Sequence, residues 1–565
     1  MNKTEWSALA LVLALGAATG LCGLGWGLPG GRRQAFAPLD SQGARHLQER
    51  WERLYQGISS SHQRMEKAEP VTYLQGFQKV APGWSFPPEP LVNSCRSFLL
   101  QPENPDEKKA FIILSRMRPW KLEFEPLYIQ YGGAFIYPLG AFLKALSLLG
   151  MLALRPEMSH YLEQPQDMGA LYLAARAFVM LFHVGSLTLL FFMGRRLSGW
   201  KTGLAAAFLF ALSPTVAANS HLIKPHPYAA FWALAAAYFM IAARQDGSRR
   251  GYLSCGACAG MAVAANFTLA TLLLLPIFPV VARGARAEWR RALSGAALAA
   301  GLFLVLNPYV ILSPRDFAWE TTIYAPTRLG LALSQAPRLL ASGVQGMGLG
   351  LTVLVMGGVL FAWRQAGARR LLALTFWLAG LALWMRFSTT ASDLAGLRIY
   401  LPLISIGVLL GADLLARLRC PPSVKAALMA LVLMETGWRG YVVLANAHLA
   451  AGPHSTPARA ADWIAAHVPV RATVGLVRYP EPAHTPPLAF DRYHLVFFDR
   501  PENLPAGREP DFLVVDREGR PLVDGWAQSR YDPPQEFLPW QAPWAGPAET
   551  SFINRAMFIY RRRGS

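Results

Sequence analysis

Two short stretches, NPDEKK at residues 104–109 and FEPLYIQYGG at residues 124–133, separate the first apolar segment of the chain from all the others. The first stretch carries the adjacent carboxylates Asp106 and Glu107, and the second ends in two glycines that lead directly into apolar sequence. Carboxylates at the edge of an apolar bundle are energetically costly, so they need partners and often mark a functional site. The segments on either side are therefore expected to fold around this loop.

The composition is that of a membrane protein. The chain has 565 residues, of which 53% are hydrophobic, and its mean hydropathy is positive. Apolar runs of near membrane-spanning length recur along it, which a soluble protein of this size rarely carries. The net charge of +19 comes from basic residues in short linkers, where they set topology and meet lipid phosphates. The sequence thus predicts an all-α polytopic membrane protein and argues against a nucleic-acid partner.

The chain divides into four parts. Residues 1–28 contain an N-terminal transmembrane helix, expected to be a retained anchor because its apolar run is long and lacks a small-x-small exit. Residues 29–132 form a large first external loop, with a surface helix near residues 47–55. Residues 133–446 hold the other apolar segments, so that about eleven or twelve membrane helices are expected in all. Because Pro138 and Gly140 interrupt residues 133–154, this segment is expected to span, to re-enter or to lie along the outer interface.

The linkers of this region alternate in charge. Linkers near residues 195–201, 244–250, 283–291, 364–370 and 417–425 are basic, whereas those at 220–227, 266, 313–343 and 387–396 are poorer in Lys and Arg. The positive-inside rule then places the basic linkers in the cytoplasm and the others outside, together with the acidic loop.

Residues 447–565 differ in character from the rest. Residues 458–467 have the pattern of an amphipathic helix, and strands are predicted at 472–477, 493–498, 511–515 and 557–560. A helix followed by strands predicts a small C-terminal α/β domain. By the same topology this domain lies outside the cytoplasm, on the side of the acidic loop.

The five cysteines give no disulfide framework. Cys255-Gly256-Ala257-Cys258 has the spacing of a redox motif, but it lies in a Gly- and Ala-rich apolar segment. Close helix packing is therefore the favoured interpretation.

Asp106 and Glu107 are the first candidates for catalysis. A general base needs a carboxylate held near the acceptor, with a pKa that its surroundings set. One carboxylate can take a proton while its neighbour makes a hydrogen bond or holds a cation. The simpler alternative is a solvated acidic pair, which the following Lys108 and Lys109 favour.

Polar and aromatic residues in the apolar region are candidates for substrate binding. Tyr128 and Tyr131 suit a membrane interface, and Arg176, early in an apolar segment, is suited to hold a phosphate or simply reaches the interface. For the remaining cluster there are two alternatives to substrate binding. One is a metal site, for which the pattern is weak, and the other is that the polar residues only mark the ends of helices. That cluster consists of His221, Lys224 and His226, with Arg398 and Tyr400 further along the chain.

Six short motifs occur in order between residues 100 and 420. They are Pro-Asp-Glu at 105–107, Tyr-Gly-Gly at 131–133, Arg176 followed by Gly-Arg-Arg-Leu-Ser-Gly at 194–199, Leu-Ser-Pro at 212–214, Ser-His-Leu-Ile-Lys-Pro-His at 220–226, and Arg-Ile-Tyr-Leu-Pro at 398–402. In this order the chain resembles the GT-C glycosyltransferases. The resemblance is to the group of bacterial protein O-mannosyltransferases and aminoarabinose transferases. This group is similar to the dolichyl-phosphate-mannose-protein mannosyltransferases.

The resemblance implies an integral membrane glycosyltransferase of the plasma (inner) membrane. Such an enzyme moves a hexosyl or pentosyl group from a polyprenyl-phosphate donor to a lipid, glycan or protein acceptor on the extracytoplasmic face, with inversion. Asp106 would take the proton of the acceptor hydroxyl and Glu107 would orient the acceptor or tune Asp106. Arg176, Lys224 and Arg398 would meet the lipid phosphate. Whether a divalent cation takes part is left open.

One departure separates the chain from the family pattern. The family has an Asp where this chain has His226. A histidine can still make hydrogen bonds and, when protonated, can meet a phosphate. The alternative function is therefore a non-catalytic GT-C-like membrane protein that binds lipid-linked sugars or acts as an assembly scaffold.

Overall fold

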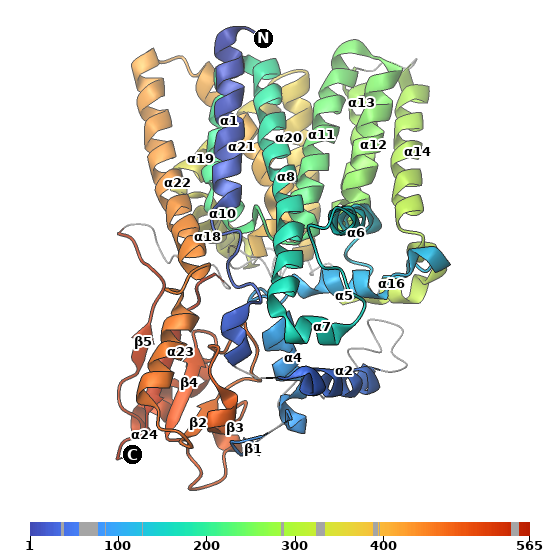
Figure 1. Cartoon of the computed structure of the whole chain (residues 1–565). Coiled ribbons are helices and arrows are strands. Elements are labelled where there is room, and N and C mark those ends of the chain that lie inside the picture. Colours follow the sequence, from blue (N-terminus) through green and yellow to red (C-terminus); the bar gives the residue numbers. More distant parts are fainter. Residues whose placement is uncertain are drawn as a thin grey trace.

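The computed structural model describes residues 1–35, 39–55, 77–84, 86–126, 128–283, 288–323, 334–387, 394, 396–543 and 553–564. In this part of the chain, long upright helices form a bundle, and a smaller domain with a β-sheet lies at one end of it (Figure 1). The N-terminus lies at the opposite end of the bundle. The predicted class, a helical multi-pass membrane protein with a C-terminal α/β domain, is confirmed.

The bundle contains most of the helices of the chain. They are α1 (Lys3–Leu21), α6 (Gly133–Leu148), α8 (Pro165–Ser198), α9 (Trp200–Leu212), α10 (Pro214–Asn219), α11 (Pro225–Asp246), α12 (Arg249–Ala265), η4 (Phe267–Ile277), α13 (Phe278–Arg283), α14 (Trp289–Leu306), α15 (Tyr309–Leu312), α16 (Pro314–Ile323), α18 (Ala336–Met347), α19 (Leu349–Trp363), α20 (Ala368–Phe387), η6 (Gly396–Tyr400), α21 (Leu401–Arg417) and α22 (Pro422–Ala450).

Fewer helices than expected are long enough to cross a membrane alone. Within the described residues there are seven, or eight if α18 and α19, which meet at 114°, form one broken span. This is fewer than the expected eleven or twelve, and the described residues also contain shorter apolar helices such as α9 and Phe267–Val281. Pro214 starts a new helix inside one expected span, and Pro276 lies inside another. The 13 residues of α9 extend about 20 Å, which is less than the apolar thickness of a bilayer.

Helix α6 does not run with the long helices. It has 16 residues with Pro138 inside it, and Figure 1 shows it nearly end-on among the upright spans. At its carboxyl end Leu148 and Leu149 are 76% and 73% exposed. Of the three arrangements that the sequence left open, this geometry fits a helix along the interface.

The bundle is held by close helix packing. A Cβ atom on Gly256 would lie 2.0 Å from the carbonyl oxygen of Gly295, so α12 and α14 touch through their backbones. All five cysteines are free, and Cys255 and Cys258 are buried. The packing interpretation of the Cys-Gly-Ala-Cys segment is confirmed.

The first loop folds into short elements beneath the bundle. They are η1 (Gly31–Ala35), α2 (Ser41–Tyr55), β1 (Gln78–Val80), η2 (Glu89–Leu91), α4 (Val92–Leu100), α5 (Lys108–Arg116) and η3 (Pro119–Lys121), with α7 (Met158–Glu163) beside them. The expected surface helix is α2. Strand β1 was not expected, because three residues carry too little periodicity to reveal a strand.

The C-terminal domain is built on a six-stranded mixed sheet. Its elements are α23 (Thr456–His467), β2 (Thr473–Leu476), η7 (Phe490–Arg492), β3 (His494–Phe497), η8 (Pro501–Asn503), β4 (Phe512–Asp516), α24 (Arg520–Arg530), β5 (Gln535–Phe537) and β6 (Met557–Arg561). The strand order is β1-β3-β2-β4-β6-β5, with β2 parallel to both its neighbours. The expected helix and four strands are confirmed. Since β1 pairs with β3, the first loop and the C-terminal domain share one sheet.

Gly132 and Gly133 allow α6 to start against the ends of two other helices. A Cβ atom on Gly132 would lie 1.8 Å from the carbonyl oxygen of Ala264, and one on Gly133 would lie 1.9 Å from that of Leu306. The backbone N–H of Gly132 donates to the carbonyl of Ala265 over 3.2 Å. Any larger residue would push α6 away from α12 and α14.

Replacing Gly132 by alanine should therefore destabilise the protein. We expect Gly132→Ala to lower the free energy of unfolding by about 1–3 kcal/mol, the usual cost of overpacking. The control is Gly301→Ala in α14, where an added Cβ meets nothing within 4 Å. Thermal unfolding midpoints in detergent measure both variants, and equal midpoints would contradict the close approach.

Candidate active site

Asp106 lies in the turn between α4 and α5, and neighbouring groups fix its backbone. Its N–H donates to Oδ1 of Asn104 over 3.1 Å, and its carbonyl accepts a hydrogen bond from the Tyr131 hydroxyl over 3.1 Å. The Asp106 side chain is 27% exposed. The carboxylate is thus held in place and still reachable from outside.

Three cationic side chains surround this carboxylate. Nζ of Lys224 forms an ion pair with it, Nη2 of Arg398 lies 3.2 Å from Oδ2, and Nζ of Lys109 lies 3.3 Å from Oδ1. Burial by itself raises the pKa of Asp106, but Lys224, Lys109 and Arg398 together hold that pKa well below its ordinary value. Burial and the charge of Arg398 lower the pKa of Lys224, and the negative charge of Asp106 opposes part of this decrease.

Local sequence explains how Lys224 reaches the site. Pro225 and Pro227 begin α11, and Lys224 precedes it as the N-cap with φ −134° and ψ 147°. A residue before proline is driven out of the helical region by the proline ring. The chain therefore arrives extended at the amino end of α11, and the ammonium group, with only 4% of its side chain exposed, meets Asp106.

Glu107 points the other way, into the bundle. Its carboxylate binds Arg176 of α8 in a bidentate pair with distances of 2.6 and 3.0 Å, and both side chains are fully buried. It also accepts from the backbone N–H of Ile223 over 2.9 Å. Arg176 in turn donates to the carbonyls of Leu24 and Trp26 over 2.8 and 2.7 Å. One ion pair thus ties the acidic loop to α8, to the segment after α1 and to the segment before α11.

The two histidines expected near the site differ in their contacts. His221 is buried and accepts a hydrogen bond from Nε1 of Trp26 over 3.2 Å. Burial lowers the pKa of His221 to about 3, so that the ring stays neutral and can accept this bond. His226 lies within electrostatic reach of Asp106, Lys224 and Arg398, and its buried Nδ1 has no partner among the described residues.

Most of the expected site residues come together. Asp106, Lys224, Arg398 and His226 share one face at the end of the bundle, while Glu107, Arg176 and His221 lie behind them in the interior. Tyr128 lies beyond Lys109, and the centre of the Tyr128 ring is 5.9 Å from Nζ of Lys109. Tyr400 follows Arg398 in η6 and has a buried hydroxyl without a partner in the described part of the chain.

Three contacts of this site were not expected from the sequence. Only the structure shows that Lys109 pairs directly with Asp106 and that Asn104 accepts a hydrogen bond from the Asp106 backbone. It also shows that Trp26 contacts both His221 and Arg176. Lys109 stands three residues after Asp106, a spacing at which side chains meet on the first turn of a helix. That spacing is the one indication that the sequence gave for any of the three.

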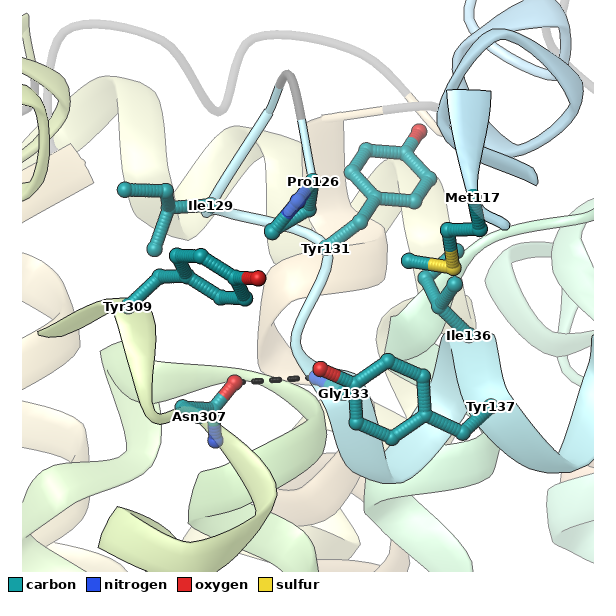
Figure 2. A pocket seen from close by; sticks show the side chains of 9 residues that line it. All are labelled: Met117, Pro126, Ile129, Tyr131, Gly133, Ile136, Tyr137, Asn307 and Tyr309. Atoms are coloured by element: carbon teal, nitrogen blue, oxygen red, sulfur yellow. Dashed lines mark hydrogen bonds between the residues drawn. The ribbon is translucent and has the colours of Figure 1, made fainter. Parts of the chain in front are cut away.

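A small pocket of about 240 Å³, counted with its open side, adjoins the acidic loop. Figure 2 shows Tyr131, Tyr137 and Tyr309 around it, with Asn307 below. Oδ1 of Asn307 accepts from the backbone N–H of Gly133 over 2.9 Å, and Nδ2 donates to the carbonyl of Ala264 over 3.1 Å. Since the Tyr131 hydroxyl also holds the backbone of Asp106, the pocket and the carboxylate are mechanically joined.

A second charged cluster lies in the C-terminal domain. His484, Asp516 and Glu518 have ligand atoms within 4.8 Å of one another, as in a metal site. However, Nη1 of Arg555 lies 2.5 Å from Asp516 and 2.7 Å from Nδ1 of His484, so a cation already occupies the cluster. Burial raises the pKa of Asp516, but His484 and Arg555 lower it to about 2 overall. The cluster is an ion pair network between β4 and the start of β6.

Comparison with known proteins confirms the resemblance over part of the chain. Residues 168–311 match the family model described as dolichyl-phosphate-mannose-protein mannosyltransferase. This segment contains Arg176, Lys224 and His226, and it ends just beyond Asn307. The match covers 144 of the 565 residues, and it is to the family that the order of the motifs resembles. No curated protein sequence matches the chain.

Several solved structures are similar in arrangement. ArnT from Cupriavidus metallidurans, bound to undecaprenyl phosphate, is 16% identical, with a TM-score of 0.42 over 83% of this chain and 95% of its own. The archaeal oligosaccharyltransferase AglB from Archaeoglobus fulgidus, in complex with an inhibitory peptide and a dolichol-phosphate, is 13% identical, with a TM-score of 0.38 over 64% and 54%. The arabinofuranosyltransferase AftD from Mycobacteria is 16% identical, with a TM-score of 0.40 over 100% and 40%.

The buried pair between Glu107 and Arg176 should dominate the stability of the site. Glu107→Ala leaves the fully buried Arg176 without its carboxylate, and we expect it to lower the free energy of unfolding by about 3–5 kcal/mol. The double variant Glu107→Leu with Arg176→Met removes both charges and should recover part of that loss. Thermal unfolding in detergent tests this, and a single variant as stable as the unaltered protein would contradict the buried pair.

Proposed function

We propose that the chain is an integral membrane glycosyltransferase that moves a sugar from a polyprenyl-phosphate donor to an acceptor on the extracytoplasmic face. The observation that carries the proposal is the Asp106 carboxylate, half-buried at the end of the bundle among Lys224, Arg398 and Lys109. Among the described residues, the site holds more positive than negative charge, because three cations surround Asp106 and Glu107 is already neutralised by Arg176. It is therefore ready to accept an anion such as the phosphate of a lipid donor.

The chemistry is a single displacement. The acceptor oxygen attacks the anomeric carbon, the bond from that carbon to the phosphate oxygen breaks, and the electron pair leaves with the phosphate. The acceptor proton goes to the Asp106 carboxylate, which acts as general base. Lys224 and Arg398 stabilise the charge that grows on the leaving phosphate. Attack opposite to the leaving group inverts the anomeric centre.

In this proposal, donor binding activates the base. While Lys224 and Arg398 pair with Asp106, its low pKa makes it a poor proton acceptor. A phosphate that takes over these two cations releases the carboxylate, and the pKa of Asp106 then rises toward its ordinary value. Asp106 thus becomes basic only when the donor is in place. No step uses a divalent cation, since the side chains around Asp106 are themselves cationic and disfavour one.

The other site residues have supporting roles in the proposal. Glu107, Arg176 and His221 position the loop from inside the bundle, because none of them reaches the surface. Tyr128, Tyr131, His226 and Tyr400 are left to contact the donor or acceptor around Asp106. The sugar is a hexosyl or pentosyl group, and the acceptor is a lipid, a glycan or a protein.

The proposed topology follows from the ends of the bundle. The N-terminal end carries basic linkers, among them Arg195, which lies 3.1 Å from Glu5, and Arg369, which pairs with Asp413. The positive-inside rule assigns that end to the cytoplasm. The described parts of the acidic loop (residues 29–132) and of the C-terminal domain (residues 447–565) are at the other end (Figure 1). We place both in the extracytoplasmic space of a plasma (inner) membrane, where the domain would help to select the acceptor.

His226 supports one alternative. The family pattern has an Asp at this position, and the unpartnered Nδ1 of His226 offers a site that a bound lipid-linked sugar could fill without reaction. A non-catalytic binding protein or scaffold would use the same cations to hold the phosphate. The two functions differ in whether Asp106 is needed for transfer.

The Asp106→Asn variant separates these functions. Loss of the base should reduce transfer about 100-fold or more, the usual range for general base catalysis. Mass spectrometry of polyprenyl-phosphate sugars and glycoconjugates would compare cells that carry the gene, the variant or neither. We expect the variant to match cells without the gene. The control is Asp246→Asn, an exposed carboxylate at the cytoplasmic end of α11, which should behave as wild type. Equal products in all strains would favour the scaffold.

Binding of the lipid phosphate tests the release of the base separately. Undecaprenyl phosphate should raise the unfolding midpoint of purified protein, and the rise should be at least as large for Asp106→Asn, which no longer competes for the cations. Lys224→Met should weaken binding by about 10- to 100-fold, the worth of a charged hydrogen bond. Weaker binding by Asp106→Asn would contradict competition between carboxylate and phosphate.

A further inference from the structure

A short hairpin connects α5 to the segment that precedes α6. The backbone N–H of Arg118 donates to the carbonyl of Glu123 over 2.9 Å, and the N–H of Glu123 donates back over 3.2 Å. Between them, η3 makes a tight turn at Pro119 and ends at Leu122 in the left-handed region, with φ +57°. A leucine in that region is strained, and such strain concentrates at functional positions.

The tip of this hairpin exposes two large apolar side chains. Trp120 is 79% exposed and Leu122 is 80% exposed, and among the described residues no other large hydrophobic side chain is more exposed than Leu122. Covering such a side chain is worth about 1.5–3 kcal/mol. Binding of a partner that covers this tip would therefore be favourable.

The hairpin lies level with the end of a membrane-spanning helix. Its flanking residues Met117 and Pro126 line the same pocket as Asn307 and Tyr309, which directly follow the last turn of α14 (Figure 2). Glu125 also lies 3.4 Å from the hydroxyl of Ser313, which follows α15.

The apolar surface continues from the spans to this level. Val305 near the end of α14 is 73% exposed, and Ile311 and Leu312 of α15 are 63% and 69% exposed. These side chains belong to the helices that meet the residues flanking the hairpin, because Asn307 after α14 and Tyr309 of α15 line one pocket with Met117 and Pro126. The hairpin therefore stands where the lipid-facing surface meets the aqueous side.

The charges around the tip complement a lipid headgroup layer. Arg116, Arg118 and Lys121 are exposed beside Trp120 and Leu122, and Glu123 is the one carboxylate among residues 116–123. Tryptophan prefers the membrane interface, and basic side chains meet lipid phosphates there.

We propose that the Arg118–Glu123 hairpin is a membrane-interface anchor whose partner is the bilayer leaflet on the side of the acidic loop. Trp120 and Leu122 insert beneath the headgroups, and the neighbouring basic side chains contact lipid phosphates. The anchor does not depend on the proposed reaction, but it bears on the site. Helix α5 begins two residues after Asp106 and ends two residues before the hairpin, so about 14 Å of helix connects the carboxylate to the lipid surface.

Depth-dependent quenching tests the anchor. In a parent with Cys22→Ala and Cys420→Ser, which removes the two cysteines that are not buried, Leu122→Cys would be labelled with an environment-sensitive fluorophore. The full chain would be placed in phosphatidylcholine and phosphatidylglycerol vesicles that contain a lipid with a nitroxide near the headgroup. The matched control is Leu522→Cys in α24 of the C-terminal domain, which is 47% exposed.

We expect the label at residue 122 to emit at shorter wavelength and to be quenched several-fold more strongly than the label at residue 522. Raising the phosphatidylglycerol content should strengthen the quenching at residue 122 only. Equal quenching at both positions would overturn the proposal, and so would a label that is shielded from both water and the nitroxide lipid, since a protein would then cover the tip. Trp120→Cys provides a second labelling site if the variant at residue 122 unfolds.

Discussion

The buried ion pair between Glu107 and Arg176 is the contact on which the arrangement of the site depends. It joins the first loop to α8 inside the bundle, and its two members also hold the backbones of Ile223, Leu24 and Trp26. Because Glu107 points inward, the preceding Asp106 points outward to the cationic face. A pair of neighbouring carboxylates thus separates into one group that holds the structure and one that remains reachable. Two buried charges are tolerated because each is fully hydrogen-bonded.

The excess of positive charge around Asp106 follows from three separate parts of the chain. Lys224 is delivered by the prolines at the start of α11, Arg398 by the short helix before α21, and Lys109 by the first turn of α5. Such an arrangement binds anions, and it also keeps the carboxylate weakly basic until an anion arrives. In the proposed function, the same feature would account for donor recognition and for the order of events in the reaction. Of the three cationic residues, only Lys224 lies within the family match over residues 168–311.

Sequence reasoning predicted the class of fold, the C-terminal helix and strands, and most of the residues that meet at the site. These have periodic or motif-based patterns that a single sequence carries. It overestimated the number of self-sufficient spans, because apolar composition does not reveal that Pro214 and Pro276 break helices. It also missed β1, which is three residues long and forms only by pairing with β3, hundreds of residues away. The opposite directions of Asp106 and Glu107 were equally invisible, since tertiary contacts alone decide them.

The central claim is that Asp106 and a lipid phosphate compete for Lys224 and Arg398. An experimental structure of the protein with bound undecaprenyl phosphate tests it most directly. We expect the phosphate within hydrogen-bonding distance of Nζ of Lys224 and of the Arg398 guanidinium, with the Asp106 carboxylate released from both and facing the open side of the site. A phosphate bound elsewhere, with the pairs of Asp106 unchanged, would contradict the account.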